Sequence, residues 1–523
     1  MWQGIRYASG AGPVPFAHPM QRIAHRRVLI VVTVAVAIVA AACTGPAPLD
    51  VAGVRPPEMG PPVIDVVVLA GDDLSAIDAA VTVDDAPLAP GTTPEMMSFT
   101  WPGEPVLIEA SSPGFESYAE TIEEPPSGNR IEVRLEPVVL KGRVTTDIGL
   151  PLPGAKVRLD TATDVSNDDG LFEIGRAEPG DIELERPAWN DQTLTWDGSS
   201  DQIEIAMEPL EIIGLRVGGR APGDAVRWAE LLRLANNTSV NAFVIDIKDE
   251  FGTVFHDTEV AEAQAIGAVS PFFDLDEIVE EMDAAGIYKI ARIAAFQDTL
   301  MATANPDHAV LHSETGELWR TNVDEAWMDP SDPVSYEYPI ALAEEACRAG
   351  FDEAQFDFAS FPFGGSKATA VFDAENNEEN RVDSIIQFLE RAYSLLNPLG
   401  CAVGSSLLGI TLESSIDEGV GQRPGRMSRT IDVLSPTLYS TNYGPGWKDF
   451  ADPDAHAVQI VDEALASGQS RLEGFAYLRP WLQTWTVTSE DVVNLQRVTA
   501  QRGMGWMLWS NSASYSSEIL PRQ

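Results

Sequence analysis

The chain has 523 residues, with 34 Lys and Arg against 80 Asp and Glu, so its formal net charge is −46. That balance excludes a general nucleic-acid-binding protein, which would present a basic face. At about 100 to 200 residues per domain the length predicts about three domains, and 44% hydrophobic residues suffice to build buried cores. The acidic residues are spread along the chain, which favours a role in solubility or salt adaptation over a specific cation site.

The N-terminus has the pattern of an export signal. A basic segment that includes Arg26 precedes an uncharged run over residues 28–42, which has the length of a signal-peptide core and is too short for a permanent membrane span. The run ends in Ala40-Ala41-Ala42-Cys43, which resembles a bacterial lipobox, so we expect residues 1–42 to be removed and Cys43 to be lipidated. Ordinary cleavage beside an incidental cysteine is the alternative, and Met20 is a second candidate start. Both readings predict export, and the first predicts a protein anchored to the extracytoplasmic face of the cell membrane.

The remaining cysteines and the histidines predict no metal site. Cys347 and Cys401 are the only cysteines after Cys43, so we expect no disulfide framework and interpret both as small core residues. The six histidines are scattered without paired-ligand spacing. The sequence therefore predicts no metal and no organic cofactor.

The region before residue 211 reads as a tether and two β modules. Residues 43–62 are rich in Pro and Gly, as in a stiff linker. Short alternating strands then occupy 63–137 and 138–210, and the segment 130–137 is echoed by 202–209. This spacing predicts two tandem β-sandwich modules.

The second module resembles the carboxypeptidase regulatory-like fold. The resemblance rests on its Pro-Gly-Ala-x-Val strand, on Asp169-Gly170 with Phe172 behind it, and on Pro179-Gly180. The Asp-Gly pair predicts a hairpin turn. The first module looks like a looser copy, or like the related PEGA-type module. Such modules act as spacers or as glycan-adhesive units.

Residues 211–523 alternate apolar strands with amphipathic helical stretches, which predicts a (β/α)8 barrel; a doubly wound open sheet is the alternative. The predicted strands are 212–217, 242–247, 287–296, 354–361, 402–408, 431–439, 474–482 and 505–509.

Residues at the carboxyl ends of barrel strands face the active-site mouth. Here they are acids, arginines and aromatics, which suits carbohydrate chemistry: aromatic faces stack on sugars, and two carboxyl groups serve a glycosidase. Asp249, Asp298, Asp246 and Asp357 have an alternative role as helix caps or as partners of buried bases. Trp481 and Trp509 could equally be core residues of the barrel mouth.

Residues 213–515 resemble the glycoside hydrolase domain catalogued as domain of unknown function 4015, a member of the TIM-barrel glycosidase superfamily. The resemblance is carried by Asp246-Ile247-Lys248-Asp249 with Gly252, by the segment around Arg292, by Gln355-Phe356-Asp357-Phe358 and by Arg479-Pro480-Trp481-Leu482-Gln483. It implies that Asp357 is the carboxylate nucleophile or stabiliser and that Asp246 and Arg292 line the same mouth.

The chain departs from the family pattern on strand 5. Where an acid is expected, the segment Gly404 to Gly409 has Ser406, and a hydroxyl cannot replace a carboxylic acid. Glu413 or Asp417 could take over as the general acid, but nothing in the sequence positions them.

Two hypotheses follow. The first is a glycoside hydrolase that cleaves a polysaccharide or oligosaccharide, with Asp357 and Asp246 as the catalytic carboxylates. The second is a degenerate barrel that binds glycan without cleaving it. Both predict a monomer that contacts the membrane through its lipid. The expected substrate-binding residues are Arg292, Asp298, Tyr439, Arg479, Trp481, Gln483 and Trp509.

Overall fold

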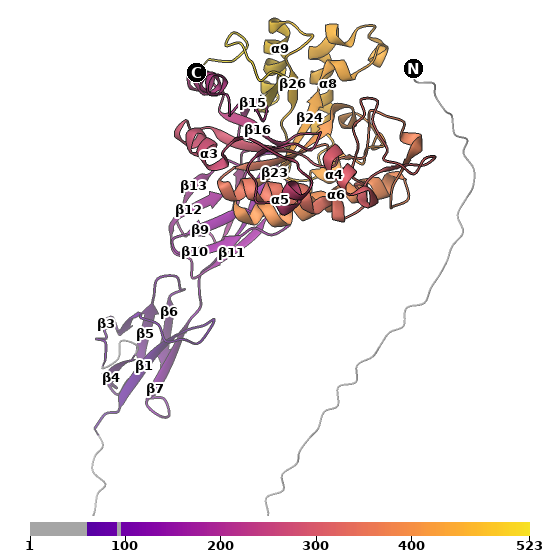
Figure 1. The fold of residues 1–523 in the computed structure, drawn as a ribbon. Helices are drawn as coiled ribbons and strands as arrows, with labels where there is room; N and C mark the ends of the chain where they lie inside the picture. The colour runs from indigo at the N-terminus through magenta and orange to yellow at the C-terminus, as the bar shows by residue number, and fades with distance from the viewer. Residues whose placement is uncertain (1–59, 92–95, 523) are drawn as a thin grey trace, which may run out of the picture. The chain divides into compact units, whose positions relative to one another are not determined.

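A computed structural model describes residues 60–91 and 96–522 (Figure 1). The predicted signal peptide, the lipidation site Cys43 and most of the predicted tether therefore lie outside the described residues.

The first β module is built from two sheets that enclose one apolar core. One sheet has the strand order β4-β1-β7 and the other β3-β2-β5-β6. Alternate residues of the strands point inward; in β7, for example, Ile131, Val133 and Leu135 are buried between exposed charged residues. The strands of this module are β1 (Val63–Ala70), β2 (Ala80–Val83), β3 (Ala86–Pro87), β4 (Met96–Thr100), β5 (Val106–Ser111), β6 (Tyr118–Ile122) and β7 (Arg130–Leu135).

The second module repeats this plan with sheets of order β11-β8-β14 and β10-β9-β12-β13. Its strands are β8 (Val139–Thr146), β9 (Lys156–Leu159), β10 (Ala162–Val165), β11 (Leu171–Gly175), β12 (Gly180–Glu185), β13 (Gln192–Trp196) and β14 (Gln202–Met207). The echoed sequence segments are equivalent strands, because β7 pairs in parallel with β1, and β14 pairs in parallel with β8. The sequence repeat thus corresponds to a structural repeat.

The Asp169-Gly170 turn differs from the predicted hairpin. It joins β10 to β11, and these strands belong to opposite sheets of the module. Gly170 has φ of +75°, and a Cβ there would lie 2.2 Å from the carbonyl oxygen of Val144. The glycine is required by the left-handed backbone and by this close approach to β8.

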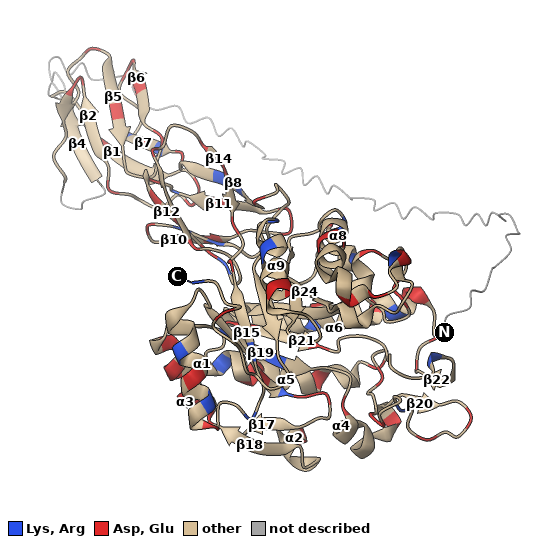
Figure 2. Cartoon of the chain, turned by 90° about the horizontal axis from the view of Figure 1, so that it is seen from above, with Lys and Arg blue, Asp and Glu red and all other residues tan. Residues whose placement is uncertain are grey.

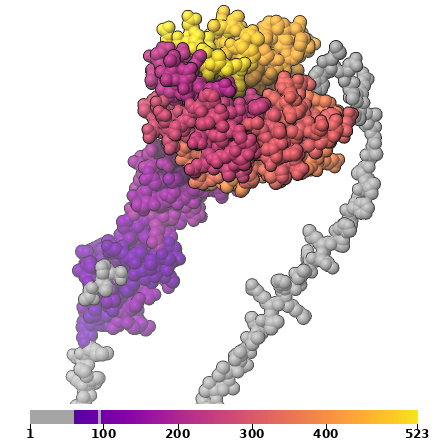
Figure 3. Space-filling view, viewed as in Figure 1, coloured from indigo at the N-terminus to yellow at the C-terminus, as the bar shows by residue number. Residues whose placement is uncertain are grey.

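The described residues after Leu210 form a closed eight-stranded parallel barrel with helices outside it, which confirms the predicted fold class (Figure 1). The first strand pairs with both the second and the last, which closes the barrel. In Figure 3 the yellow C-terminal surface accordingly adjoins the magenta surface of the early barrel residues. The barrel strands are β15 (Ile213–Val217), β16 (Ala242–Lys248), β19 (Tyr288–Ala294), β21 (Glu353–Asp357), β23 (Ala402–Leu408), β24 (Val433–Leu438), β25 and β26 (Tyr477–Leu478 and Trp481–Gln483, one interrupted strand) and β27 (Trp506–Trp509).

The helices between the strands begin and end at recognisable signals. Asp224 accepts hydrogen bonds from the first turn of its helix, and Thr488 forms a reciprocal capping box with Asp491. Gly350, with φ of +109°, ends the helix that precedes β21. The main helices are α1 (Ala225–Asn237), α3 (Leu275–Ala284), α5 (Val334–Ala349), α6 (Glu378–Leu396), α8 (Ala457–Gln469) and α9 (Ser489–Ala500).

The loops of the barrel also contain short strands and short helices. The strands are β17 (Val254–His256), β18 (Val269–Phe273), β20 (Leu311–His312) and β22 (Ala370–Val371). The α helices are α2 (Ala261–Ala265), α4 (Thr299–Ala304) and α7 (Pro424–Met427). The single-turn helices are η1 (Pro306–His308), η2 (Lys367–Thr369), η3 (Asn397–Leu399), η4 (Gly409–Leu412), η5 (Ser440–Asn442), η6 (Trp447–Asp449) and η7 (Pro453–His456).

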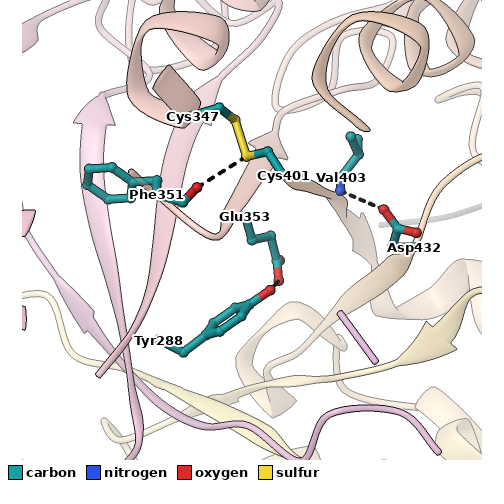
Figure 4. The surroundings of a disulfide bond; sticks show 7 residues. All are labelled: Tyr288, Cys347, Phe351, Glu353, Cys401, Val403 and Asp432. Atoms are coloured by element: carbon teal, nitrogen blue, oxygen red, sulfur yellow. Dashed lines mark hydrogen bonds between the residues drawn. A yellow bond between two sulfur atoms is a disulfide. The ribbon is translucent and has the colours of Figure 1, made fainter. Parts of the chain in front are cut away.

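Cys347 and Cys401 are joined in a disulfide, which corrects the expectation of two separate core residues (Figure 4). Their Cα atoms lie 5.8 Å apart although 54 positions separate them in the sequence. The barrel explains this approach, because the end of α5 and the start of β23 meet at the amino-terminal rim of adjacent strands β21 and β23. The large sequence separation of Cys347 and Cys401 gave no indication that they lie close together in the fold.

The second β module is bound to the barrel through a buried ion pair. Arg186 contacts Asp432 at 2.8 Å, and both side chains are completely buried. The Arg186 guanidinium also lies 4.8 Å from the ring centroid of Phe475. The backbone N–H of Val403 donates to the other oxygen of Asp432 at 2.8 Å (Figure 4). The module therefore shares a core with the barrel and is not a detached spacer.

Acidic residues are dispersed over helices, loops and β modules (Figure 2). This distribution matches the expectation from the sequence that the negative charge is not gathered at one site. Within the part of the chain that the structure describes, no helix has the length and apolar character needed to cross a bilayer.

Candidate active site

A cavity of about 190 Å³ opens at the carboxyl ends of the barrel strands. Its lining combines two carboxylates and an arginine with aromatic and small polar side chains. The lining residues are Glu250, Arg292, Asp357, Phe358, Ser360, Phe363, Ser406, Leu407, Leu408, Gln422, Thr437, Tyr439, Asn442 and Trp509.

Asp357 ends β21 at this cavity and is held by Arg292 of the neighbouring strand β19. The Nε and Nη2 atoms of Arg292 contact Oδ2 of Asp357 at 2.8 and 2.7 Å. Oδ1 accepts the backbone N–H of Phe358 at 2.9 Å. Phe358 has φ of +53°, a left-handed conformation that is strained for a bulky residue and is typical of functional sites. The carboxylate is thus fixed at the point where the backbone turns out of the barrel.

Asp246 lies below Asp357, inside the barrel. It is paired in register with Arg292, whose Nη1 contacts it at 3.3 Å, and it also pairs with Arg216 of β15. Its side chain is 2% exposed and does not line the cavity. Arg292 contacts Asp246 and lines the cavity, so Asp246 acts on the site through Arg292.

Trp509 lines the cavity, and its ring packs against the guanidinium groups of two arginines. The guanidinium carbon of Arg216 lies 4.0 Å from the ring centroid and that of Arg292 lies 4.8 Å from it. Tyr439 also lines the cavity and packs against Trp485, with ring centroids 4.9 Å apart. Tyr439, Trp485 and Trp509 are all partly exposed, and of the three Tyr439 and Trp509 line the cavity, where a ring face can meet a sugar.

Glu250 is the second carboxylate at the cavity. Its Oε2 lies 3.4 Å from Nη2 of Arg292, the same nitrogen that contacts Asp357. Burial alone would raise the pKa of Glu250, but the charges of Arg292 and Arg216 lower it overall. Burial likewise works to lower the pKa of Arg292, and its three carboxylate neighbours Asp357, Asp246 and Glu250 raise it far above the ordinary value.

Four predicted substrate-binding residues lie outside the cavity. Asp298 caps α4 through Met301 N–H and pairs with Lys248 at 2.8 Å, which is the alternative role considered for it. Arg479 forms a fully buried ion pair with Glu353, the first residue of β21, so it lies near the amino-terminal ends of the strands and away from the cavity. Trp481 is completely buried in the barrel interior.

Gln483, the last of the four, stabilises a loop. Its amide nitrogen donates to the carbonyl of Trp485 at 2.9 Å and to the hydroxyl of Thr486 at 3.0 Å. Gln483 therefore stabilises the loop that carries Trp485 through these two hydrogen bonds.

Ser406 of β23 lines the cavity where the family pattern has an acid. Its hydroxyl has no hydrogen-bond partner among the described residues. The two possible substitutes for the acid lie elsewhere: Glu413 pairs with Lys448, and Asp417 is 2% exposed and pairs with Arg381 at 2.7 Å. Neither Glu413 nor Asp417 lines the cavity.

Glu250, Arg216 and Trp485 were not among the site residues predicted from the sequence. Glu250 and Arg216 follow or end predicted strands, so the rule that places functional residues at strand ends could have found them. Trp485 lies in a loop, where no comparable rule applies. Over residues 60–91 and 96–522, no cluster of three or more His, Cys, Asp or Glu side chains is arranged to hold a metal ion.

The fold and the cavity define a barrel of the glycoside hydrolase type. Residues 214–515 match a domain family described as "Putative glycosyl hydrolase domain". Because this match spans more than half of the 523 residues, the chain belongs to that family, as the resemblance in the sequence implied.

No curated protein matches the chain. Among solved structures, a hypothetical protein from Ruminiclostridium thermocellum ATCC 27405 is 31% identical, with a TM-score of 0.34, and the match covers 36% of this chain and 96% of that one. The PgaB (BpsB) glycoside hydrolase domain from Bordetella bronchiseptica is 13% identical, with a TM-score of 0.42, covering 58% and 95%. A class V chitininase from Pseudomonas fluorescens Pf-5 is 9% identical, with a TM-score of 0.38, covering 59% and 98%.

Proposed function

We propose that the chain hydrolyses a glycosidic bond of a polysaccharide or oligosaccharide, with Asp357 as the nucleophile or as the carboxylate that stabilises an oxocarbenium-like transition state. The observation that carries the proposal is the double contact of Arg292 with Oδ2 of Asp357 at the cavity. These charge-assisted contacts fix the position of the carboxylate at the cavity, which either role requires.

The aromatic residues support a sugar substrate. Tyr439 and Trp485 form a partly exposed pair beside the carboxylate. Aromatic faces of this kind bind the apolar faces of pyranose rings. The proposed reaction needs only water and carboxylates, so it requires neither a metal nor an organic cofactor.

A second candidate function is glycan binding without cleavage. It is favoured by Ser406, which occupies the expected place of the strand 5 acid and lines the cavity. A barrel without any proton donor would keep affinity for its glycan while losing turnover.

We further propose that the protein acts as a monomer at the extracytoplasmic face of the membrane, held there by a lipid on Cys43. The Cys347–Cys401 disulfide supports export, because such bonds form and persist in oxidising compartments. Labelling of the wild type with radioactive palmitate, and loss of the label in Cys43→Ser, tests the anchor.

The enzymatic proposal is tested by sugar release. The chain carrying Cys43→Ser is incubated with a panel of bacterial and algal polysaccharides beside the same chain with Asp357→Asn. Release that disappears in the variant supports hydrolysis. Retained binding by both proteins without release from any glycan supports the second candidate.

A further inference from the structure

Glu250 and Asp246 have very different access to the cavity. The side chain of Glu250 is 37% exposed and lines the cavity, whereas that of Asp246 is 2% exposed and does not. Oε2 of Glu250 and Oδ2 of Asp357 contact one nitrogen, Nη2 of Arg292, at 3.4 and 2.7 Å. These two oxygens can be no further apart than the sum of the two distances, so one sugar ring can reach both carboxylates.

Hydrogen bonds within the loop that carries Glu250 fix the backbone conformation of that loop. Oδ1 of Asp249 accepts the backbone N–H groups of Phe251, Gly252 and Thr253 at 3.1, 3.1 and 2.8 Å. This side chain therefore closes the loop immediately after Glu250, and Asp249 itself does not line the cavity.

A second contact anchors the same loop to the barrel. Gly252 has φ of +107°, and a Cβ there would lie 2.2 Å from Oδ1 of Asp298. Asp298 is fixed in turn by its 2.8 Å ion pair with the buried Lys248. The family motif residues Lys248, Asp249 and Gly252 thus share one task, which is to position Glu250.

We infer that Glu250 is the acid–base partner of Asp357, replacing the carboxylic acid that strand 5 lacks. This inference rests on the proposed hydrolase function. In the first step an oxygen of Asp357 bonds to the anomeric carbon, the glycosidic C–O bond breaks, and protonated Glu250 gives its proton to the leaving oxygen. In the second step water bonds to the anomeric carbon, the bond to Asp357 breaks, and Glu250 takes the proton from that water.

The charges around Glu250 fit a group that changes protonation on binding. In the free protein Arg292 and Arg216 lower its pKa against the opposing effect of burial. Its acidic neighbours include Asp249 and Glu325, and Asp357 on the same nitrogen of Arg292. A sugar in the cavity excludes water and strengthens the burial effect, so substrate binding favours the protonated form that the first step needs.

The test compares Glu250→Gln, Asp246→Asn and Glu413→Gln in the full chain carrying Cys43→Ser. Each is assayed on the polysaccharide that the parent chain degrades and on the 2,4-dinitrophenyl glycoside of the released sugar, with and without sodium azide. We expect Glu250→Gln to lose about 10²- to 10⁴-fold on the polysaccharide. The loss should be much smaller on the dinitrophenyl glycoside, whose leaving group needs no proton, and azide should increase the rate and yield a glycosyl azide of unchanged anomeric configuration.

Each alternative result has a definite meaning. Asp246→Asn should lose activity equally on both substrates without azide rescue, because it acts through Arg292, and Glu413→Gln should match the parent. Undiminished polysaccharide cleavage by Glu250→Gln overturns the inference and leaves the hydrolase proposal intact. An equal loss on both substrates without azide rescue also overturns it, because that pattern marks a purely structural role. Absence of release by the parent chain refutes the hydrolase function itself and the inference with it.

Discussion

Arg186 of the second β module and Asp432 of the barrel form an ion pair at 2.8 Å in which neither side chain is exposed. Tyr477 adds a second link across the same interface, donating from its hydroxyl to the carbonyl of Ala188 at 3.1 Å. The amino-terminal end of the barrel is therefore covered by the module. Residues of the module and of the barrel also share one hydrophobic cluster.

Breaking this ion pair should destabilise the protein strongly. Arg186→Ala leaves the buried carboxylate of Asp432 without its counter-ion, which costs about 3 to 5 kcal/mol of unfolding free energy. Urea unfolding followed by tryptophan fluorescence measures the loss. Arg158→Ala, which breaks an exposed pair with Glu183, is the matched control and should cost about 0 to 1 kcal/mol. Equal costs for the two variants would show that the module is only tethered to the barrel.

The disulfide should also contribute measurable stability. Closing a loop across 54 positions restricts the unfolded chain, which corresponds to about 4 kcal/mol in the chain-entropy account. Cys347→Ser and Cys401→Ser should therefore each lower the urea midpoint, and the double variant should lose no more than either one. Thiol titration of the denatured, unreduced Cys43→Ser chain should find no free thiol, and two thiols would contradict the bond.

The barrel could be predicted from sequence because each strand is a short apolar run followed by an amphipathic helix. All eight predicted strands overlap the observed ones, from Ile213–Val217 to Trp506–Trp509. Four predicted site residues do line the cavity, because each lies at or near the carboxyl end of a strand: Asp357, Arg292, Tyr439 and Trp509. Arg479 and Trp481 were predicted too close to the cavity. Both precede the strand end at Gln483, and Arg479 pairs with Glu353 at the start of β21.

Other features depend on contacts between distant segments. The Cys347–Cys401 bond requires the adjacency of β21 and β23, and the role of Asp249 requires the folded loop beside Glu250. Glu250 was visible as an acid after a strand, but only the cavity distinguishes it from the buried Asp246. Glu250 and Asp246 carry the same functional group, and they differ in burial and in whether the side chain lines the cavity.

Trp481 and Tyr439 should respond differently to truncation. Trp481 is completely buried, so Trp481→Ala should cost about 3 to 5 kcal/mol of stability through the cavity it leaves. Tyr439→Ala should instead weaken glycan binding, because Tyr439 lines the cavity and is partly exposed. Thermal unfolding and isothermal titration with the bound oligosaccharide separate the two effects. A selective loss of affinity in Trp481→Ala would contradict this assignment.

Glu345 should stabilise the barrel in a pH-dependent way. Burial raises its pKa, but hydrogen bonds from His256, Thr258 and the backbone of Glu259 lower it overall below the ordinary value of 4.5. A lowered pKa in the folded state means that its contribution is complete above pH 4.5 and is lost as the pH falls through the folded value. Glu345→Gln should therefore be less stable than the parent at neutral pH, with a difference that shrinks in acid. A difference that grows in acid would contradict the sign of this pKa shift.

The proposed role of Asp357 is best tested by sugar release from Asp357→Asn beside the parent chain, on whichever polysaccharide the parent degrades. The substitution keeps the size of the side chain and removes the charge that Arg292 holds at 2.7 Å. We expect release to fall by several orders of magnitude while glycan binding persists. Release at the parent's rate would contradict this role, because the reaction would then not depend on the carboxylate at the centre of this site.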